Sequence, residues 1–480
     1  MSQRDYHLIV IGGGGAGLAA AVTARDAGAS VLICEAADRL GGSSAASGGL
    51  FYAAGTSLQR AQGIDDSADD LFHHYMLLNR WEIEPAVARR YADESAGTVE
   101  WLMSLGVEFH SEVLTVGQSK VPRGHLPKLN GFGIVQALDA SVSRGGVEVA
   151  LNARVERLLT DAAGSVVGVR VDGVDVRSDA VVVACGGVGN ATRDVRRNYF
   201  PDSEMFGDEW NFYIGAETNR GDAIALAEGV GAEITGRNCG LMIASASYYK
   251  NVEGPLPGWP VFVNRRGRRF INEQADYSVV AHNINRQPDR ICFAIMDHRA
   301  FTRSPDDARY RSVQIGGVGA PSFDPDWLAQ GLAQGAIFSA DSLEELAQKA
   351  QIRQEAFLSS IAEYNRDARD GCDSRFFKDA GAMVAIEQPP FYAVPRRAAQ
   401  ISVSSVGLHI DADARVYADA GSYVRGLYAA GEASGGVWNH YVASGCAIGN
   451  CMIFGRVAGR KAAAWSAELS GSSRAYRSEG

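Results

Sequence analysis

A tyrosine and a glycine near the C-terminal end of the chain are the residues whose spacing points most directly to chemistry. Tyr441 lies four residues before Gly445, in a glycine-rich turn that follows the apolar run GLYAAGE. The residues after Gly445 are typical of a helix, whose first backbone N–H groups would face whatever the turn binds. The pattern therefore predicts a strand, a turn and a helix, with an anionic or electron-rich ring system bound at the turn.

A second pattern with chemical meaning opens the chain. An apolar strand over residues 6–11 runs into G-x-G-x-x-G, with Gly12, Gly14 and Gly17 in register, then an Ala-rich helix and a second strand that ends in Glu35. The glycines of this motif allow a tight turn and close approach of the backbone to a pyrophosphate, and the acid accepts a ribose hydroxyl. The spacing predicts a dinucleotide site.

The loop after Glu35 separates FAD from NAD. Residues 37–51 have the sequence ADRLGGSSAASGGLF, which predicts a Gly/Ser-rich loop. In two-dinucleotide flavoproteins, the loop at this place also contacts the cofactor. A plain flexible loop is the alternative, because small polar residues are also ordinary loop chemistry. Residues 39–51 hold no histidine, which a covalent flavin link would use. We therefore expect FAD bound noncovalently.

Sixteen positions are predicted to bind this cofactor, and none is predicted to bind a metal. They come from the two glycine-rich loops, a strand near residue 155, the run AVVVACGGVGN and the last turn and helix. The positions are Gly12, Gly14, Ala16, Gly17, Glu35, Gly42, Ser43, Ser44, Gly48, Gly49, Val155, Gly186, Gly187, Glu432, Ala447 and Ile448.

Composition excludes several classes of partner. The 480 residues can bury a large core, and the net charge of −10 includes no basic block that could follow a phosphate backbone, so nucleic acid is excluded. The seven cysteines form no C-x-x-C pair, which suits a reducing compartment. No apolar run approaches the roughly 18 residues that span a bilayer. With a strand beginning almost at residue 1, we expect a cytoplasmic protein.

The order of elements predicts an α/β fold of two domains. Residues 65–105 have helical spacing, and residues 148–184 alternate like a β-meander. From residue 192 the composition becomes mixed aromatic and polar, with a helix over 219–234 and then a strand, an Arg-Arg-Gly turn and a polar loop that holds Asn272, Glu273, Asp276 and Tyr277. We expect a Rossmann-type FAD-binding domain (1–191 and 396–480) with an inserted α+β capping domain (192–395) that binds substrate.

The motifs in combination resemble the fumarate reductase and succinate dehydrogenase flavoprotein superfamily. They are the strand with GGGGAG and Glu35, GGSSAASGG, ACGG, VNRRGRRFINE, PPFYAVP, VGLHID and GLYAAGE with the GGV, CAIG and FGRVAG that follow. The resemblance covers nearly the whole chain. It implies an FAD domain and a capping domain with the substrate between them, against the flavin.

Three positions depart from the dicarboxylate enzymes of that superfamily, which hold their substrate with arginines and histidines. The proton-donating arginine falls on Tyr277, the arginine of the last turn on Val442, and the histidine before the GG-x-x-ID segment on Val403. Two buried carboxylates without ionic partners would cost several kcal/mol. Fumarate and succinate are therefore excluded as substrates.

The substitutions are instead similar to the 3-ketosteroid dehydrogenases and related cyclic-ketone desaturases. That resemblance implies that Tyr441 and the Gly445 N–H bind the substrate carbonyl and that Tyr277 takes the α proton while the β hydrogen leaves as hydride to FAD. The substrate would be a 3-ketosteroid or a single ring such as 4-oxocyclohexanecarboxylate, and the electron acceptor oxygen, a quinone or another external oxidant. Two departures are the lack of a tyrosine between residues 106 and 133, and Asp276 where proline is implied.

Other readings stay open. The same chemistry run backwards would make the protein a reductase of an enone or activated alkene. A third reading is a non-catalytic electron-transfer flavoprotein. Tyr441 could also be a packing residue in its turn. If the substrate carries a carboxylate, Arg123, His125, Arg396 or Arg397 could receive it, although paired arginines are usually solvated at the surface.

Overall fold

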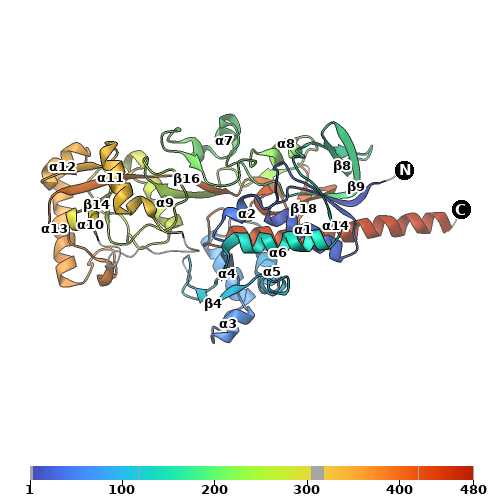
Figure 1. Ribbon diagram of the computed structural model, residues 1–480, viewed down its shortest axis with the longest axis horizontal. Coiled ribbons are helices and arrows are strands. Elements are labelled where there is room, and N and C mark those ends of the chain that lie inside the picture. Colours follow the sequence, from blue (N-terminus) through green and yellow to red (C-terminus); the bar gives the residue numbers. More distant parts are fainter. Residues whose placement is uncertain (1–3, 118, 304–317, 420, 479–480) are drawn as a thin grey trace. The chain divides into compact units, whose positions relative to one another are not determined.

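The chain forms two compact units (Figure 1). The computed structural model describes residues 4–117, 119–303, 318–419 and 421–478. Unit 1 consists of Met1–Glu204, Gly215–Leu241 and Val403–Gly480, and unit 2 of Met205–Ile214 and Met242–Ser402. Residues 192–204 and 215–241, which the sequence analysis assigned to the capping segment, thus cluster with unit 1.

A parallel sheet forms the centre of unit 1. Its parallel strands lie in the order β19-β9-β1-β2-β6: β19 (Tyr423–Ala429), β9 (Val174–Val183), β1 (Tyr6–Ile11), β2 (Val31–Cys34) and β6 (Glu148–Ala150). β2 and the last four residues of β1 are buried and apolar, as expected for strands covered on both faces. Helix α1 (Gly15–Asp26) packs against α6 (Asn130–Arg144) and α14 (Cys446–Ser478), beside which it lies in Figure 1. The predicted strand, helix and strand at the start of the chain are confirmed.

The predicted meander over 148–184 is only partly correct. Its first strand, β6, pairs in parallel with β2 instead of with its sequence neighbour. The antiparallel part is β7 (Val155–Thr160), β8 (Val166–Val171) and β9, and β9 then joins β1 in parallel. Alternating residues predict a strand but not its partner, because pairing depends on which apolar faces meet in the fold.

The rest of unit 1 surrounds this sheet. The predicted helical region 65–105 contains α4 (Ala68–Leu78) and α5 (Pro85–Ser104), which pack against each other. β18 (Arg415–Tyr417) belongs to the sheet itself, where it pairs antiparallel with β19. Other described elements of this unit are α2 (Gly42–Ala46), β3 (Phe51–Tyr52), α3 (Ser57–Ala61), β4 (Phe109–Leu114), β5 (Gly124–Pro127), α7 (Arg193–Tyr199), α8 (Asp222–Glu228), β11 (Ile234–Thr235), β17 (Gly407–His409) and β20 (Ser434–Gly435).

Unit 2 is built on a separate sheet. Its longest strand, β16 (Phe391–Ser404), pairs antiparallel with β14 (Cys292–Met296), which in turn pairs with β13 (Val261–Val263). Two apolar clusters pack on this sheet, one containing Phe262 and the other Phe293. The other elements are β10 (Phe212–Tyr213), β12 (Gly240–Ser245), α9 (Tyr277–Asn285), α10 (His298–Phe301), α11 (Pro325–Ala333), β15 (Phe338–Ala340), α12 (Leu343–Lys349) and α13 (Gln354–Asp370).

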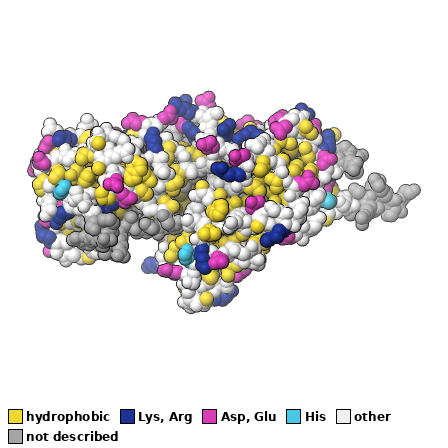
Figure 2. Space-filling model, in the orientation of Figure 1, with side chains coloured by type: hydrophobic (Ala, Val, Ile, Leu, Met, Phe, Trp, Pro, Cys, Tyr) yellow, Lys and Arg dark blue, Asp and Glu magenta, His cyan; other side chains and the backbone are white. Residues whose placement is uncertain are grey.

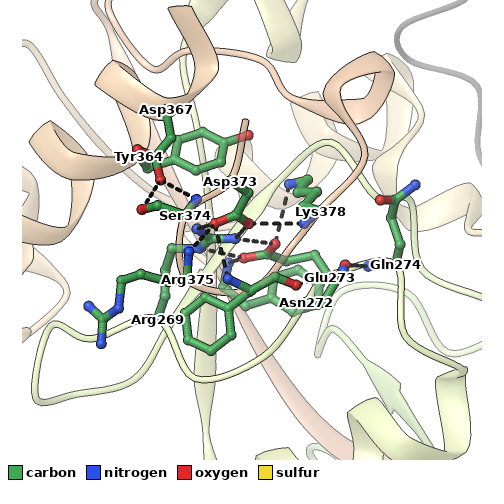
Figure 3. A network of polar contacts seen from close by, with 12 residues as sticks. Arg269, Asn272, Glu273, Gln274, Tyr364, Asp367, Asp373, Ser374, Arg375 and Lys378 are labelled. Carbon is green, nitrogen blue, oxygen red and sulfur yellow. Dashed lines mark hydrogen bonds and ion pairs between the residues drawn. The ribbon is translucent and has the colours of Figure 1, made fainter. Parts of the chain in front are cut away.

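A buried ion network lies next to β13 in unit 2 (Figure 3). The Arg269 guanidinium donates to Glu273 at 2.9 Å and to Asp373 at 2.8 Å, and the Lys378 ammonium lies 3.3 Å from Glu273. All four side chains are at most 4% exposed. Glu273 also accepts the backbone N–H of Phe262. The network therefore ties the loop that leads to α9 to the segment after α13.

Because of this network, the free energy of unfolding of unit 2 should decrease at acid pH. Burial alone would raise the pKa of Asp373, but its bonds with Arg269 and with two backbone N–H groups outweigh burial and lower the pKa to about 2. A carboxyl group whose pKa is lowered in the folded state stabilises the fold at every pH above the pKa of the unfolded chain. This stabilisation is lost as pH falls from about 4 to about 2. We expect Asp373→Asn to lower the free energy of unfolding by about 2 kcal/mol at pH 7. In urea unfolding, the difference in this free energy between variant and wild type should become smaller below pH 4. A gap that does not change with pH would contradict this assignment.

The surface carries both signs of charge. On the face shown in Figure 2, Lys and Arg side chains alternate with Asp and Glu, without a continuous basic area. No helix in the described part of the chain is both long and apolar enough to cross a bilayer.

Candidate functional site

A pocket in unit 1 lies at the carboxyl ends of β1, β2 and β9. In parallel sheets this edge is where cofactors bind, because the loops that follow the strands converge there. Ten of the sixteen predicted cofactor positions line it: Gly12, Gly14, Ala16, Glu35, Gly42, Ser43, Ser44, Val155, Gly186 and Glu432.

The glycines of the first loop leave the pocket open to a ligand. Gly12 has φ +99°, and a Cβ there would lie 2.5 Å from the Ala184 carbonyl oxygen. A Cβ on Gly17 would lie 1.8 Å from the Gly12 carbonyl oxygen, so α1 can approach the turn only because residue 17 is glycine. The N-terminus of α1 points its first N–H groups toward this edge, which favours an anionic group such as a pyrophosphate.

Two carboxylates stand in the pocket, those of Glu35, which is buried, and of Glu432, which is partly buried. Glu35 accepts the N–H groups of Gly13 at 2.6 Å and Ala37 at 2.7 Å, and each oxygen keeps a second lone pair for a hydroxyl. Glu432 accepts the Ser404 N–H at 2.7 Å and its hydroxyl at 2.9 Å. Burial raises the pKa of Glu432, against the opposing effect of these bonds. Both side chains can therefore accept further hydrogen bonds from ribose or ribityl hydroxyls.

Six predicted cofactor positions lie outside this pocket: Gly17, Gly48, Gly49, Gly187, Ala447 and Ile448. Gly17 supports helix packing, and Gly187 lies against Glu432, whose carboxylate a Cβ at 187 would meet at 2.5 Å. Ala447 and Ile448 belong to the first turn of α14. Their roles in cofactor binding stay predictions.

The sequence reasoning missed other residues that line the pocket: Ile11, Gly15, Cys34, Ala36, Ala153, Arg154, Ala184, Cys185, Thr218, Asn219, Asp222 and Cys451. Arg154 and Asp222 form an ion pair, and Asn219 donates to Glu432 at 3.2 Å. Asp222 is the first residue of α8. An acid at a helix start was visible in the sequence, but no local pattern shows that this helix begins at the pocket.

The predicted turn before α14 is confirmed. It packs closely against other residues of unit 1. Gly445 has φ +101°, and a Cβ there would lie 2.8 Å from the Tyr52 nitrogen. Tyr441 is partly exposed, and its ring meets the buried Trp438 edge to face at 5.2 Å. Val442, which replaces an arginine of the dicarboxylate enzymes, is buried. The phenol of Tyr441 therefore has a packed ring on one side and access to solvent on the other.

Tyr277 lies in unit 2 and not in a loop. The predicted polar loop ends at Asp276, which caps α9 by accepting the Ser278 N–H at 2.9 Å, and Tyr277 is the first residue of the helix. Its side chain is 8% exposed. An aspartate before a helical run is an N-cap signal that the sequence analysis overlooked.

Two of the arginines considered as carboxylate receptors, Arg123 and Arg396, are buried and not solvated, whereas Arg397 is partly exposed. Arg123 pairs with Asp66 through two bonds of 2.8 and 2.6 Å, and both side chains are at most 3% exposed. Arg396 is fully buried against Glu253 at 3.1 Å. His125 is buried with its Nε2 2.8 Å from the Thr56 hydroxyl, and Arg397 donates to the Asp289 carbonyl. Because Arg123 and Arg396 already have carboxylate partners, neither offers an unpaired charge to a substrate.

The Gly12 turn gives a testable prediction about the cofactor. Gly12→Ala should weaken FAD binding by more than about 10-fold, because the added Cβ strains a left-handed residue and strikes the Ala184 carbonyl. Gly28→Ala is the matched control, since Gly28 has φ +88° but nothing within 4 Å of its added Cβ. Absorbance at 450 nm after desalting measures bound FAD. Stoichiometric FAD in the Gly12 variant would contradict the assignment.

Comparisons with known proteins agree with this site. A family model described as "FAD binding domain" matches residues 7–448. The chain is 28% identical over 474 residues to the NADH:fumarate oxidoreductase of Klebsiella pneumoniae (strain 342), covering 96% of this chain and 48% of that protein. It is 27% identical to the urocanate reductase of Eggerthella lenta, covering 96% and 75%. The chain thus spans about half the length of the first relative and three quarters of the second.

A solved structure is similar over the whole chain. The 3-ketosteroid Δ1-dehydrogenase of Sterolibacterium denitrificans, in complex with 1,4-androstadiene-3,17-dione, superposes with a TM-score of 0.80 at 21% identity, covering 96% of this chain and 99% of that one. At this identity the likeness is one of fold. Among the described residues, no group of three His, Cys, Asp or Glu side chains could hold a metal ion.

Proposed function

Because the chain belongs to the FAD binding domain family, and within it to the fumarate reductase and succinate dehydrogenase flavoprotein superfamily, we propose that it desaturates a cyclic ketone. The family consists of FAD-binding oxidoreductases, and FAD is the cofactor of this chain. The proposed reaction removes two hydrogens from the bond α,β to the carbonyl of a 3-ketosteroid or of a smaller ring such as 4-oxocyclohexanecarboxylate. An external oxidant such as oxygen or a quinone takes up the electrons.

The residues of the pocket fit FAD. The site combines a loop that excludes a Cβ at Gly12, a helix N-terminus and two carboxylates with spare lone pairs, one buried and one partly buried. These are the groups that a pyrophosphate and two sets of sugar hydroxyls need. We propose that unit 1 is a Rossmann-type FAD domain, that the cofactor is held noncovalently, and that unit 2 is the inserted capping domain.

The observation that carries the ketone proposal is the neutral character of the turn at 438–445. Its only ionisable base is His440, and burial, with Arg80 nearby, lowers the pKa of that ring against the opposing effect of Glu82. The positions of the dicarboxylate-binding arginine and histidine carry Val442 and Val403. A substrate with a carboxylate at this turn would lack an ionic partner, whereas a ketone oxygen needs only hydrogen-bond donors.

In the proposed mechanism the chain's own residues activate the carbon acid. The Tyr441 hydroxyl and the Gly445 N–H donate to the carbonyl oxygen as enolate charge develops, which acidifies the α carbon. Tyr277, as a phenolate or within a relay, takes the α proton. A phenolate is a stronger base than a carboxylate and is therefore better suited to remove a proton from carbon. FAD, when bound, supplies the acceptor for the β hydride at N5.

A second candidate is the reverse reaction, reduction of an enone or activated alkene. The names of the two reported relatives favour it, because one is a fumarate oxidoreductase that uses NADH and the other a urocanate reductase. In this direction the same donors would polarise the enone carbonyl, and Tyr277 would return a proton to the α carbon.

Anaerobic mixing distinguishes the candidates. Saturated 4-oxocyclohexanecarboxylate or a saturated 3-ketosteroid should bleach the flavin absorbance of the holoprotein at 450 nm. If only the prereduced protein reacts, and only with an enone, the reductase reading replaces ours. If neither class of compound changes the spectrum, the electron-transfer reading gains and the ketone proposal fails.

A further inference from the structure

The turn that carries Tyr441 is bonded to two residues that no motif pointed to, Tyr75 of α4 and Asn79, the residue that caps the C-terminal end of α4. Tyr75 and Asn79 lie four residues apart, so they share one face of the helix. Both side chains are completely buried. The Tyr75 hydroxyl donates to the Val437 carbonyl at 3.2 Å. The Asn79 side-chain oxygen accepts two backbone N–H groups of the turn, those of Asn439 at 2.8 Å and His440 at 3.0 Å.

The orientation of the Asn79 amide follows from these contacts. Its oxygen faces two N–H donors, while its nitrogen donates to the Tyr75 carbonyl at 3.0 Å in the last turn of α4. A flipped amide would bring its NH₂ group against both N–H donors of the turn. Asn79 therefore couples the end of α4 to the backbone directly before Tyr441.

Other contacts hold the turn on either side of the residues bonded to Tyr75 and Asn79. The Asn439 side chain donates to the Glu82 carbonyl at 3.2 Å and accepts a bond from Cys239. Gly117 approaches so closely that a Cβ there would lie 2.8 Å from the Val442 carbonyl oxygen. At its end, Gly445 lies against β3. The backbone at 439 and 440 is thus held by one side chain, and the next residue is the phenol that we assign to the carbonyl.

We propose that Asn79 is a positioning residue that sets the Tyr441 hydroxyl for the carbonyl oxygen. The proposal rests on the function proposed above. A catalytic group must be held within a fraction of an ångström, and misplacement by 1 Å can cost about 10²-fold in rate. Loss of the Asn79 acceptor frees two N–H groups directly before Tyr441, so the effect should appear in kcat more than in KM.

The test compares three variants of the holoprotein. Asn79→Leu removes the acceptor at similar volume, whereas Asn79→Asp keeps an oxygen for both N–H groups. Asn365→Leu is the matched control in unit 2, where the Asn365 amide makes two backbone bonds of 2.8 Å to Ile386. All three are measured for retained FAD, for hydrogen exchange of the peptide covering 437–441, and for kcat and KM with 4-oxocyclohexanecarboxylate and a saturated 3-ketosteroid.

We expect Asn79→Leu to speed exchange at 439 and 440 by more than about 10-fold and to lower kcat by about 10²-fold, with Asn79→Asp restoring most of both. Asn365→Leu should change neither. Unchanged exchange in Asn79→Leu, or a kcat loss no larger than that of the control, would overturn the inference. A wild type that oxidises no ketone would instead refute the proposed function and leave the exchange result standing, so the two failures are distinguishable.

Discussion

Tyr277→Phe and Tyr441→Phe should each retain FAD and lose turnover of a saturated cyclic ketone by about 10² to 10³-fold. For Tyr441 the loss reflects one hydrogen-bond donor to the developing enolate oxygen, and for Tyr277 the loss of the group that takes the α proton. Neither change removes a large apolar contact, because the phenyl rings stay. Stopped-flow bleaching of the flavin in single turnover measures the chemical step directly.

Tyr199→Phe is the control for a lost phenol hydroxyl. Tyr199 ends α7 in unit 1, and its hydroxyl donates to Glu228 at 3.0 Å. It should keep wild-type turnover and FAD content. Full activity in either test variant would remove the role assigned to that residue. A Tyr441 variant that loses activity together with FAD would point to a packing role for this tyrosine instead.

Arg269→Leu should cost about 3–5 kcal/mol of unfolding free energy. Removal of the guanidinium leaves the carboxylates of Glu273 and Asp373 buried with backbone N–H groups and the Lys378 ammonium as the partners that the network retains (Figure 3). An unpaired buried charge costs several times more than a lost surface ion pair, because water cannot replace the missing partner. Urea unfolding, followed by a probe in unit 2, measures the change.

Arg375→Leu is the matched substitution in the segment that carries Asp373. Arg375 pairs with Glu363 at 3.2 Å, but about half of its side chain is exposed, at 47%. Its loss should cost less than about 1 kcal/mol. Equal losses in the two variants would show that burial does not govern the energy of this network.

Local spacing determined the parts of the protein whose chemistry lies in neighbouring residues. The glycine-rich turn after β1 and the acid that ends β2 could be placed from sequence, because a tight turn, a helix start and an apolar strand are all local properties. The same holds for the turn at Gly445 and the start of α14. An alternating run, in contrast, did not reveal that β6 pairs with β2.

Only the tertiary structure showed which residues far apart in the sequence pair with one another. It paired Arg123 with Asp66 and Arg396 with Glu253, so that side chains that the sequence suggested for a substrate proved to be internal ion pairs. It also brought Asn79 within 3.0 Å of the backbone at 439 and 440, across 360 residues of chain. Burial and charge pairing depend on which elements meet, and no periodicity within one element carries that information. The sequence alone therefore indicated the cofactor and singled out the tyrosine before α14, whereas the contacts of Tyr75 and Asn79 with the turn before this tyrosine became visible only in the fold.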